Sequence, residues 1–241
     1  MIIQVLMPMA GLGSRFQNEG VTILKPLIKV GDCPMYKRAI HSLLVDGLEL
    51  SLFFVIKDQD QINHQFGDCL KNDFPKAKII MLPQMTRGSL ETCYQSASFL
   101  DFSLPLVILD CDFEFKSQDF ISYMQTSTPE HAAGALVSFD SQNPRYSYAR
   151  IENEEVIETA EKKVISSHAL AGAYYFTRAK YFFDEASEVL KESSEMTSEI
   201  NFYIAPLYNR LLKKDKIIKF FKLDQYKSFG TPEELQMSGY K

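Results

Sequence analysis

Short apolar runs alternate with helical segments along the first half of the chain. The runs that have the length of buried strands are residues 2–7, 50–56, 77–82 and 106–109. Helical periodicity is found between them, at residues 35–44 and 90–100, and a polar helix is expected after residue 56. Buried strands that alternate with helices are typical of a parallel sheet with helices on both faces.

The second half of the chain has a different pattern. Strand-like segments separated by polar turns are predicted at residues 135–139, 148–151, 156–160, 171–176 and 217–223. Amphipathic helices are predicted at residues 181–191 and 202–212. Near the end, Thr231 is a suitable N-cap and Pro232 a suitable first residue of a last helix. We therefore expect one α/β domain over residues 1–241, with a mixed, mostly parallel sheet.

The composition is that of a globular protein: 46% of the 241 residues are hydrophobic and 24% are charged. No apolar run approaches the roughly 20 residues of a membrane span. The N-terminal apolar segment has no basic residues before it, so we interpret it as a strand and not as a signal peptide. The four cysteines are far apart and lack zinc-site spacing, which favours reduced thiols in a cytoplasmic protein.

The net charge of −5 argues against a dedicated nucleic-acid-binding protein, which usually carries a basic excess. A small anionic substrate is compatible with this charge, because a few cations in one cleft are enough to bind it. The sequence predicts neither a nucleic-acid partner nor a membrane partner, and it leaves self-association open.

A glycine-containing loop, residues 8–16, follows the first predicted strand. In an open α/β sheet, ligands bind at the carboxyl ends of the strands. Gly11 and Gly13 would let backbone amides approach phosphate oxygens, and Arg15 could bind phosphate with two donors. Phe16 replaces the third glycine of a dinucleotide-binding loop, and the Gly-Lys-Ser/Thr of a P-loop is absent. A tight loop with one surface arginine remains the alternative.

The predicted strand 106–109 ends in Asp110, Cys111 and Asp112. Two carboxylates at the end of a buried strand are costly unless a cation or a donor meets them. Magnesium suits such a position, because it takes one or two carboxylates together with substrate phosphates. The alternative is that both carboxylates face solvent beyond the strand.

Several motifs in order along the chain carry a family resemblance. Gly-x-Gly-x-Arg is followed by Lys25, Pro26 and Leu27, and then by Pro34 and Met35 at a helix start. This stretch resembles the N-terminal signature of the sugar-phosphate nucleotidyltransferases. The resemblance implies a GT-A-like (Rossmann-like) fold and an enzyme that joins a nucleoside triphosphate to a sugar 1-phosphate, or to a related sugar or polyol phosphate, with release of pyrophosphate. It divides the domain into a nucleotide-binding half, about residues 1–130, and an acceptor-binding half, about residues 131–241.

The resemblance also implies roles for particular residues. It makes Arg15 and Lys25 the catalytic cations, which would stabilise charge on the phosphates. It makes Mg²⁺ the cofactor and Asp112 its ligand. The resemblance supports metal binding by Asp110 less strongly. The residues that it assigns to nucleotide binding are Ala10, Gly11, Gly13, Ser14, Gln84 and Gly88. For the last two, which would recognise the base, an ordinary loop before a helix is the alternative.

In the second half, Pro144-Arg-Tyr-Ser-Tyr-Ala149, a Glu-Lys pair and a Gly-x-Tyr-Tyr-Phe segment resemble a subgroup associated with capsule and surface-polysaccharide biosynthesis. The resemblance implies that Glu161 accepts hydrogen bonds from acceptor hydroxyls, that Lys162 binds the acceptor phosphate, and that Gly172 allows close approach. For Glu161 and Lys162 a solvated turn is the alternative. With Arg15 and Lys25, Lys162 would form a small basic cleft in an acidic protein.

One position departs from the family pattern. Many relatives have a second metal-binding aspartate two residues before the closing Gly-Thr-Pro-Glu motif, and here that residue is Ser228. Either one aspartate suffices, or the nearby Asp224 takes its place, or catalysis is impaired. Two other functions stay open. Asp110 and Asp112 also resemble the metal motif of the GT-A glycosyltransferases, which use a nucleotide sugar, and Ser228 leaves open a non-catalytic nucleotide-binding relative. The length also leads us to expect the transferase core without an appended domain.

Overall fold

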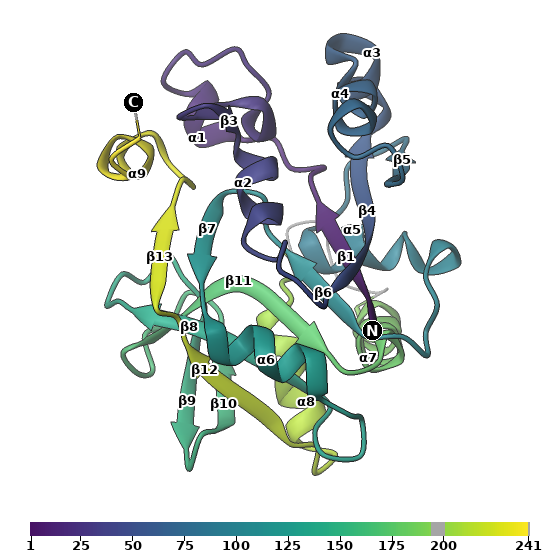
Figure 1. Ribbon diagram of the computed structural model, residues 1–241, viewed down its shortest axis with the longest axis vertical. Helices are drawn as coiled ribbons and strands as arrows, with labels where there is room; N and C mark the ends of the chain where they lie inside the picture. The colour runs from purple at the N-terminus through teal and green to yellow at the C-terminus, as the bar shows by residue number, and fades with distance from the viewer. Residues whose placement is uncertain (194–200, 241) are drawn as a thin grey trace.

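A computed structural model describes residues 1–193 and 201–240 of the chain (Figure 1). Its centre is a nine-stranded sheet with the strand order β5-β4-β1-β6-β11-β8-β12-β10-β9. Two small two-stranded sheets accompany it: β13 pairs with β7, and β2 (Lys29–Val30) pairs with β3 (Cys33–Pro34). Among the described residues, no helix is long and apolar enough to cross a membrane.

The first half of the chain forms the parallel part of the sheet. Strand β1 (Ile2–Pro8) lies between β4 (Glu49–Lys57) and β6 (Leu106–Leu109), and β5 (Lys78–Leu82) pairs with β4. All of these neighbours run parallel. The four apolar runs predicted as strands are therefore confirmed.

The second half adds mainly antiparallel strands. Strand β11 (His168–Phe176) pairs antiparallel with both β6 and β8 (Gly134–Asp140), and β12 (Ile218–Lys222) runs parallel to β8. Strands β10 (Glu155–Ala160) and β9 (Tyr148–Glu152) form a hairpin at the edge. The predicted mixed α/β class is confirmed, with the parallel pairing concentrated among β5, β4, β1 and β6.

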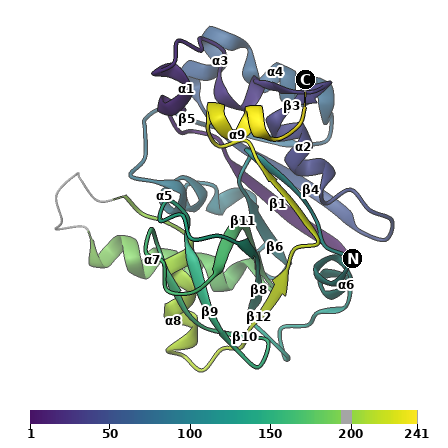
Figure 2. The ribbon, with the colours of Figure 1, turned by 90° about the vertical axis from the view of Figure 1, so that its left-hand side faces the viewer.

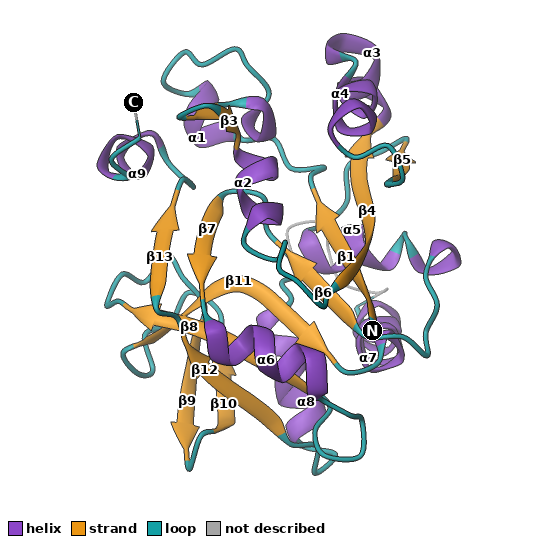
Figure 3. Ribbon diagram, in the orientation of Figure 1, coloured by secondary structure: helices purple, strands orange, loops and turns teal. Residues whose placement is uncertain are grey.

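Helices cover both faces because successive strand side chains point to opposite sides. Leu6 packs in one core with α5 (Ser89–Tyr94), α7 (Ala179–Glu192) and α8 (Tyr208–Leu212). Its neighbours Val5 and Met7 pack in a second core with α2 (Met35–His41), α4 (Phe66–Asp73) and α6 (Gln118–Thr126). Figure 3 shows α6 crossing in front of the sheet. The remaining polar helix, α3 (Asp58–His64), directly follows β4.

A third, smaller core joins the two ends of the chain. Phe16, next to the glycine loop, is buried with Phe229 and packs against Leu235 of α9 (Pro232–Met237). Figure 2 shows α9 beside the short α1 (Ser14–Gln17). Thr231 caps α9 by accepting a hydrogen bond from the Glu234 amide at 3.2 Å, so the predicted cap is confirmed. The C-terminal motif is thereby held against the loop after β1.

Three local differences from the prediction bear on the site. Strands β7 (Phe113–Lys116) and β13 (Gln225–Ser228) were not predicted, and they form an antiparallel pair directly after Asp112. The helix predicted at 202–212 begins later, as a 3₁₀ turn at Ala205–Leu207 followed by α8. The helix predicted at 90–100 ends at Tyr94, with a 3₁₀ turn at Ala97–Phe99 after it.

Candidate active site

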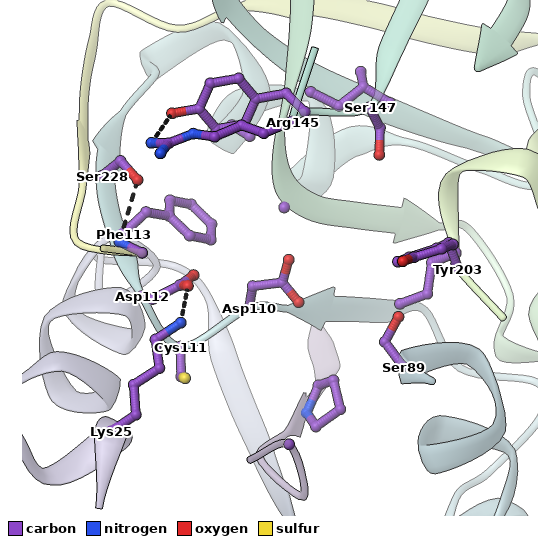
Figure 4. Close-up of a pocket in the computed structure, with 18 of the residues that line it drawn as sticks. Lys25, Ser89, Asp110, Cys111, Asp112, Phe113, Arg145, Ser147, Tyr203 and Ser228 are labelled. Carbon is purple, nitrogen blue, oxygen red and sulfur yellow. Dashed lines mark hydrogen bonds and ion pairs between the residues drawn. The ribbon is translucent and has the colours of Figure 1, made fainter. Parts of the chain in front are cut away.

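A cavity of about 580 Å³ opens at the carboxyl ends of β1 and β6 and is lined by both halves of the chain (Figure 4). The first half supplies Gly11, Gly13, Ser14, Arg15, Lys25, Ser89, Asp110 and Asp112. The second half supplies Arg145, Ser147, Glu161, Lys162, Gly172, Tyr203, Ser228, Gly230 and Glu234. Most of the predicted site residues thus lie around one cavity, although they are spread over much of the chain.

Three predicted nucleotide-binding residues do not line this cavity. Ala10 is buried in the hydrophobic core, and Gln84 is exposed outside the cavity wall. Gly88 has φ 129°, and a Cβ there would lie 2.4 Å from the carbonyl oxygen of Phe202. The glycine at this position lets residues 87–90 pair with the chain at Phe202, through backbone hydrogen bonds of 2.7 and 3.1 Å. Its neighbour Ser89 faces the cavity instead.

Lys25 packs closely against the backbone of the glycine loop. Gly13 has φ 65°, the left-handed conformation that glycine adopts readily, and a Cβ there would lie 2.9 Å from Cβ of Lys25. Ser14 and Arg15 follow with exposed side chains, and Phe16 is buried. A large apolar side chain therefore stands where a dinucleotide-binding loop has a glycine, because it anchors the loop in the third core.

Lys25 forms an ion pair with Asp112. The Lys25 Nζ lies 2.5 Å from Oδ2 of Asp112, across 87 positions of sequence. Burial alone would raise the pKa of Asp112, but the Lys25 ammonium outweighs it and holds that pKa below its usual value. Burial likewise opposes the charge on Lys25, yet the carboxylate of Asp112 raises the pKa of the lysine. Both groups are therefore ionised at neutral pH.

Asp110 lies against a bulge of β11 at Gly172. Its amide donates to the Gly172 carbonyl at 2.9 Å, and a Cβ at Gly172, where φ is 75°, would lie 2.6 Å from Oδ2 of Asp110. Burial, reinforced by the charges of Asp112 and Glu161, raises the pKa of Asp110 to about 7. Gly172 thus accommodates Asp110, a contact that the sequence did not predict.

Glu161 and Lys162 face the cavity, as the motif predicted. Glu161 accepts a hydrogen bond from Ser147, and burial raises the pKa of its carboxyl. Lys162 has a left-handed backbone, with φ 51°, and its ammonium donates to the Tyr203 hydroxyl while lying 4.5 Å from the centre of that ring. Both side chains contact other residues of the protein, but Lys162 is exposed in a bend of the chain, so a solvated turn stays an alternative for this pair.

Ser228 lies in the cavity wall, and Asp224 lies elsewhere. A Cβ at Gly230 would be 3.2 Å from Oδ2 of Asp112 and 3.6 Å from the Ser228 hydroxyl, so the three residues are neighbours. Asp224 instead accepts a hydrogen bond from the Gln118 amide at 3.1 Å, at the start of α6. The hypothesis that Asp224 takes the place of a second aspartate is therefore wrong, because β13 separates it from the cavity.

Sequence reasoning missed two charged residues of the wall, Arg145 and Glu234. They form an ion pair, and Tyr146 donates a hydrogen bond of 2.5 Å to Glu234. Both residues lie within family-like motifs, at residues 144–149 and 230–234, and those motifs assign no role to either side chain. Among the described residues that line the cavity, four basic residues face four acidic ones: Arg15, Lys25, Arg145 and Lys162 against Asp110, Asp112, Glu161 and Glu234. The cavity therefore holds as many carboxyl groups as cations, a composition that the sequence did not predict, although the raised pKa of Asp110 leaves part of that group uncharged at neutral pH.

The cavity can still accept a magnesium ion. No cluster of three or more His, Cys, Asp or Glu side chains suited to a metal occurs in residues 1–193 and 201–240. Magnesium does not require one, because it is commonly bound through one or two carboxylates, substrate phosphates and water. Asp110 and Asp112, side by side at the end of β6, offer hard oxygen donors of this kind.

Solved structures share this architecture over nearly the whole chain. The nucleoside-diphosphate-sugar pyrophosphorylase of Vibrio cholerae RC9 superimposes with a TM-score of 0.76 at 23% identity, covering 97% of this chain and 98% of that one. The inositol-1-phosphate CTP transferase of T. maritima gives 0.74 at 14% identity, with 99% and 97% covered. A UDP-glucose pyrophosphorylase gives 0.74 at 17% identity, with the same coverage. These TM-scores establish a shared fold, and the predicted fold class is confirmed.

Sequence comparison adds no closer relative. No protein-family model matches the chain, and no curated protein sequence matches it.

Proposed function

We propose that this protein is a Mg²⁺-dependent nucleotidyltransferase. It joins a nucleoside triphosphate to a sugar 1-phosphate or a related phosphorylated acceptor and releases pyrophosphate. The observation that carries the proposal is the single cavity in which Arg15, Lys25 and Asp112 of the first half face Glu161 and Lys162 of the second. The similar structures support it, since pyrophosphorylases and a CTP transferase are among them.

The reaction needs positioning and charge compensation more than a base. The acceptor phosphate is ionised near neutral pH and attacks the α-phosphorus, so that a P–O bond forms and the bond to pyrophosphate breaks. In this proposal the backbone around Gly11 and Gly13, with Arg15, holds the triphosphate. Lys25 offsets charge that develops on the α-phosphate, while Lys162 and Glu161 orient the acceptor.

The carboxyl groups of the cavity support a metal cofactor. Both substrates are polyanions, and the carboxyl groups of the wall offset much of the charge of its four cations. We propose that Asp112, with Asp110, would hold Mg²⁺, which when bound supplies compensating positive charge between the phosphates. Lys25 fixes the orientation of the Asp112 carboxylate for this purpose.

Two other functions make different predictions. Asp110 and Asp112 form an Asp-x-Asp sequence at a strand end inside the cavity, which also suits a GT-A glycosyltransferase. Such an enzyme would release a nucleoside diphosphate from a nucleotide sugar and would not use a free triphosphate. The second alternative is a non-catalytic nucleotide-binding protein, which Ser228 beside Asp112 leaves open. A protein of this kind would bind a triphosphate without turnover.

A matrix of pyrophosphate-release assays tests the proposal. Each of ATP, CTP, GTP, UTP and dTTP is combined with hexose 1-phosphates, heptose phosphates and polyol phosphates in the presence of Mg²⁺. We expect one base and one acceptor class to give turnover that a chelator abolishes. Release of no pyrophosphate from any pair would reject the proposal, and a parallel set of nucleotide sugars would detect a glycosyltransferase.

The biological setting is part of the same proposal. We propose that the product is an activated precursor for a surface polysaccharide, in line with the motifs at residues 144–149 and 172–176. We place the reaction in the cytoplasm, where nucleoside triphosphates are made. The free thiols of Cys33, Cys69, Cys93 and Cys111 support a reducing compartment.

A further inference from the structure

We propose that Arg145 is a second phosphate-binding cation for the acceptor, held ready by Glu234 of the C-terminal helix. This inference rests on the proposed function and deepens it. It gives the acceptor-binding half two cations, Lys162 and Arg145, where the sequence motifs indicated one. It also gives a role to α9, the last helix in the described part of the chain.

Arg145 is fixed at the cavity wall by three contacts. Its Nη2 pairs with the Glu234 carboxylate and donates to the Tyr146 hydroxyl at 2.9 Å. Its guanidinium carbon lies 4.9 Å from the centre of the Tyr146 ring. The Arg145 side chain keeps 27% of its surface exposed, and Glu234 keeps 16%. A long side chain that would otherwise lose conformational entropy on binding is therefore already oriented.

The guanidinium retains donors for a ligand. Arginine has five N–H groups in a planar fork that matches phosphate. Within the described part of the chain, the protein contacts of the guanidinium use Nη2, and no hydrogen-bond partner is found for Nε or Nη1. Since Arg145 lines the cavity, an anionic group inside it can reach those donors.

The surroundings of Arg145 assign it to the acceptor. It lies in the connection between β8 and β9, two residues before Ser147, which binds Glu161. Figure 4 shows Arg145 above Ser228 and Asp112, on the side of the cavity away from Ser89. The side chain therefore lines the same cavity as the residues proposed to hold the acceptor and those proposed to hold the metal and the α-phosphate. The phosphate of the attacking acceptor must also lie in this cavity.

A merely structural role for Arg145 is the competing explanation. The Arg145–Glu234 pair also ties the loop before β9 to α9, so its loss could simply loosen the cavity. Such loosening would weaken the binding of both substrates and lower the melting temperature. Loss of a phosphate contact would weaken the binding of the acceptor alone. The two explanations therefore differ in the ratio of the acceptor KM to the triphosphate KM.

The test compares Arg145→Met, Arg145→Lys and a control, Arg150→Met. Arg150 is an exposed arginine five residues on, and it pairs with Glu158 at 2.7 Å in the β9–β10 hairpin. With the active substrate pair, we expect Arg145→Met to raise the acceptor KM about tenfold while the triphosphate KM changes less than twofold, because only the acceptor phosphate loses a charged hydrogen-bond donor. Arg145→Lys should give an intermediate value, and Arg150→Met should match the wild type. An unchanged acceptor KM, or equal rises in both constants, would overturn the proposal.

Glu234→Gln serves as a second variant, which keeps the size of the side chain and removes its charge. If Glu234 positions Arg145, the Glu234→Gln variant should have a higher acceptor KM and an unchanged triphosphate KM. An acceptor KM equal to that of the wild type would reject this role. The variant also keeps the proposal testable if Arg145→Met does not fold.

A binding measurement separates failure of this inference from failure of the proposed function. If the wild type gives no turnover with any pair, the proposed function fails, and calorimetric titration with inorganic phosphate tests Arg145 by itself. Phosphate binding by the wild type that weakens about tenfold in Arg145→Met supports a phosphate-binding cation. Equal binding by both proteins, or none by the wild type, overturns it.

Discussion

The ammonium of Lys25 lies 2.5 Å from Oδ2 of Asp112, and this ion pair joins the loop after the first strand to the end of β6. Both side chains are largely buried, with exposed fractions of 21% and 26%. The lysine therefore stabilises the ionised form of the carboxylate proposed to bind the metal, and it also faces the proposed site of phosphoryl transfer.

Replacing Lys25 with Ala should affect both stability and turnover. The substitution leaves Asp112 charged without its partner, so we expect a loss of about 2 kcal/mol of unfolding free energy, less than for a fully buried pair. Turnover should fall about 100- to 1000-fold, as when one preorganised donor to a developing charge is removed. Urea unfolding and pyrophosphate release measure the two effects.

Lys37→Ala is the matched control for this experiment. Lys37 pairs with Asp73 at 2.6 Å and has a similar exposure of 30%, but neither residue lines the cavity. The control should lose stability and keep its turnover. Equal loss of turnover in both variants would mean that Lys25 acts only through stability.

Gly172→Ala should displace Asp110. The new Cβ would lie 2.6 Å from Oδ2 of Asp110, and the backbone there is left-handed, with φ 75°. We expect a loss of about 2–4 kcal/mol, which combines backbone strain with the steric overlap. Gly20→Ala, at φ 81° and with no atom within 4 Å of the new Cβ, should show the strain alone, about 1 kcal/mol. Similar losses in the two variants, measured by chemical denaturation, would contradict the overlap.

Asp110 should make the stability of the protein depend on pH. Its pKa is about 7 in the folded protein, because burial disfavours the carboxylate. In the unfolded chain an aspartate loses its proton near pH 4. The folded state therefore holds a proton that the unfolded state has released, and stability falls as the pH rises from about 4 to about 7.

Asp110→Asn removes this titration and should be more stable than the wild type at pH 8, by on the order of 2 kcal/mol. The comparison is made by urea unfolding at pH 5 and pH 8 with a chelator present, so that divalent cations do not contribute. A difference between the two proteins that is the same at both pH values would contradict the raised pKa.

Ser228→Asp should strengthen magnesium binding. Ser228 lies beside Gly230 and Asp112, so the substitution places a further carboxylate at the same part of the wall. We expect the half-saturating Mg²⁺ concentration for pyrophosphate release to fall about fivefold, since an added charge a few ångströms away is worth roughly 1 kcal/mol in a solvated site. Ser228→Asn, which adds no charge, is the control. An unchanged Mg²⁺ requirement in Ser228→Asp would place the metal away from this part of the wall.

The sequence by itself determined the class of the fold and a large share of the candidate site. Runs such as residues 2–7 and 106–109 are too apolar to lie anywhere but in a core, and they are strands β1 and β6. Lys25, Asp112, Glu161 and Lys162 could be named because short motifs carry them, and they do line one cavity. Local pattern was sufficient here because burial and turn chemistry act over a few residues.

Only the tertiary structure decided how these groups are paired. The contacts of Lys25 with Asp112, and of Arg145 with Glu234, span 87 and 89 positions, and nothing in either segment specifies its partner. The same holds for Gly88 and Gly172, whose lack of a side chain makes room for the backbone of Phe202 and for the carboxyl group of Asp110. The sheet brings strand ends together, and the C-terminal helix closes against the first loop. Charge balance and pKa in the cavity depend on those distances, which a linear pattern does not contain.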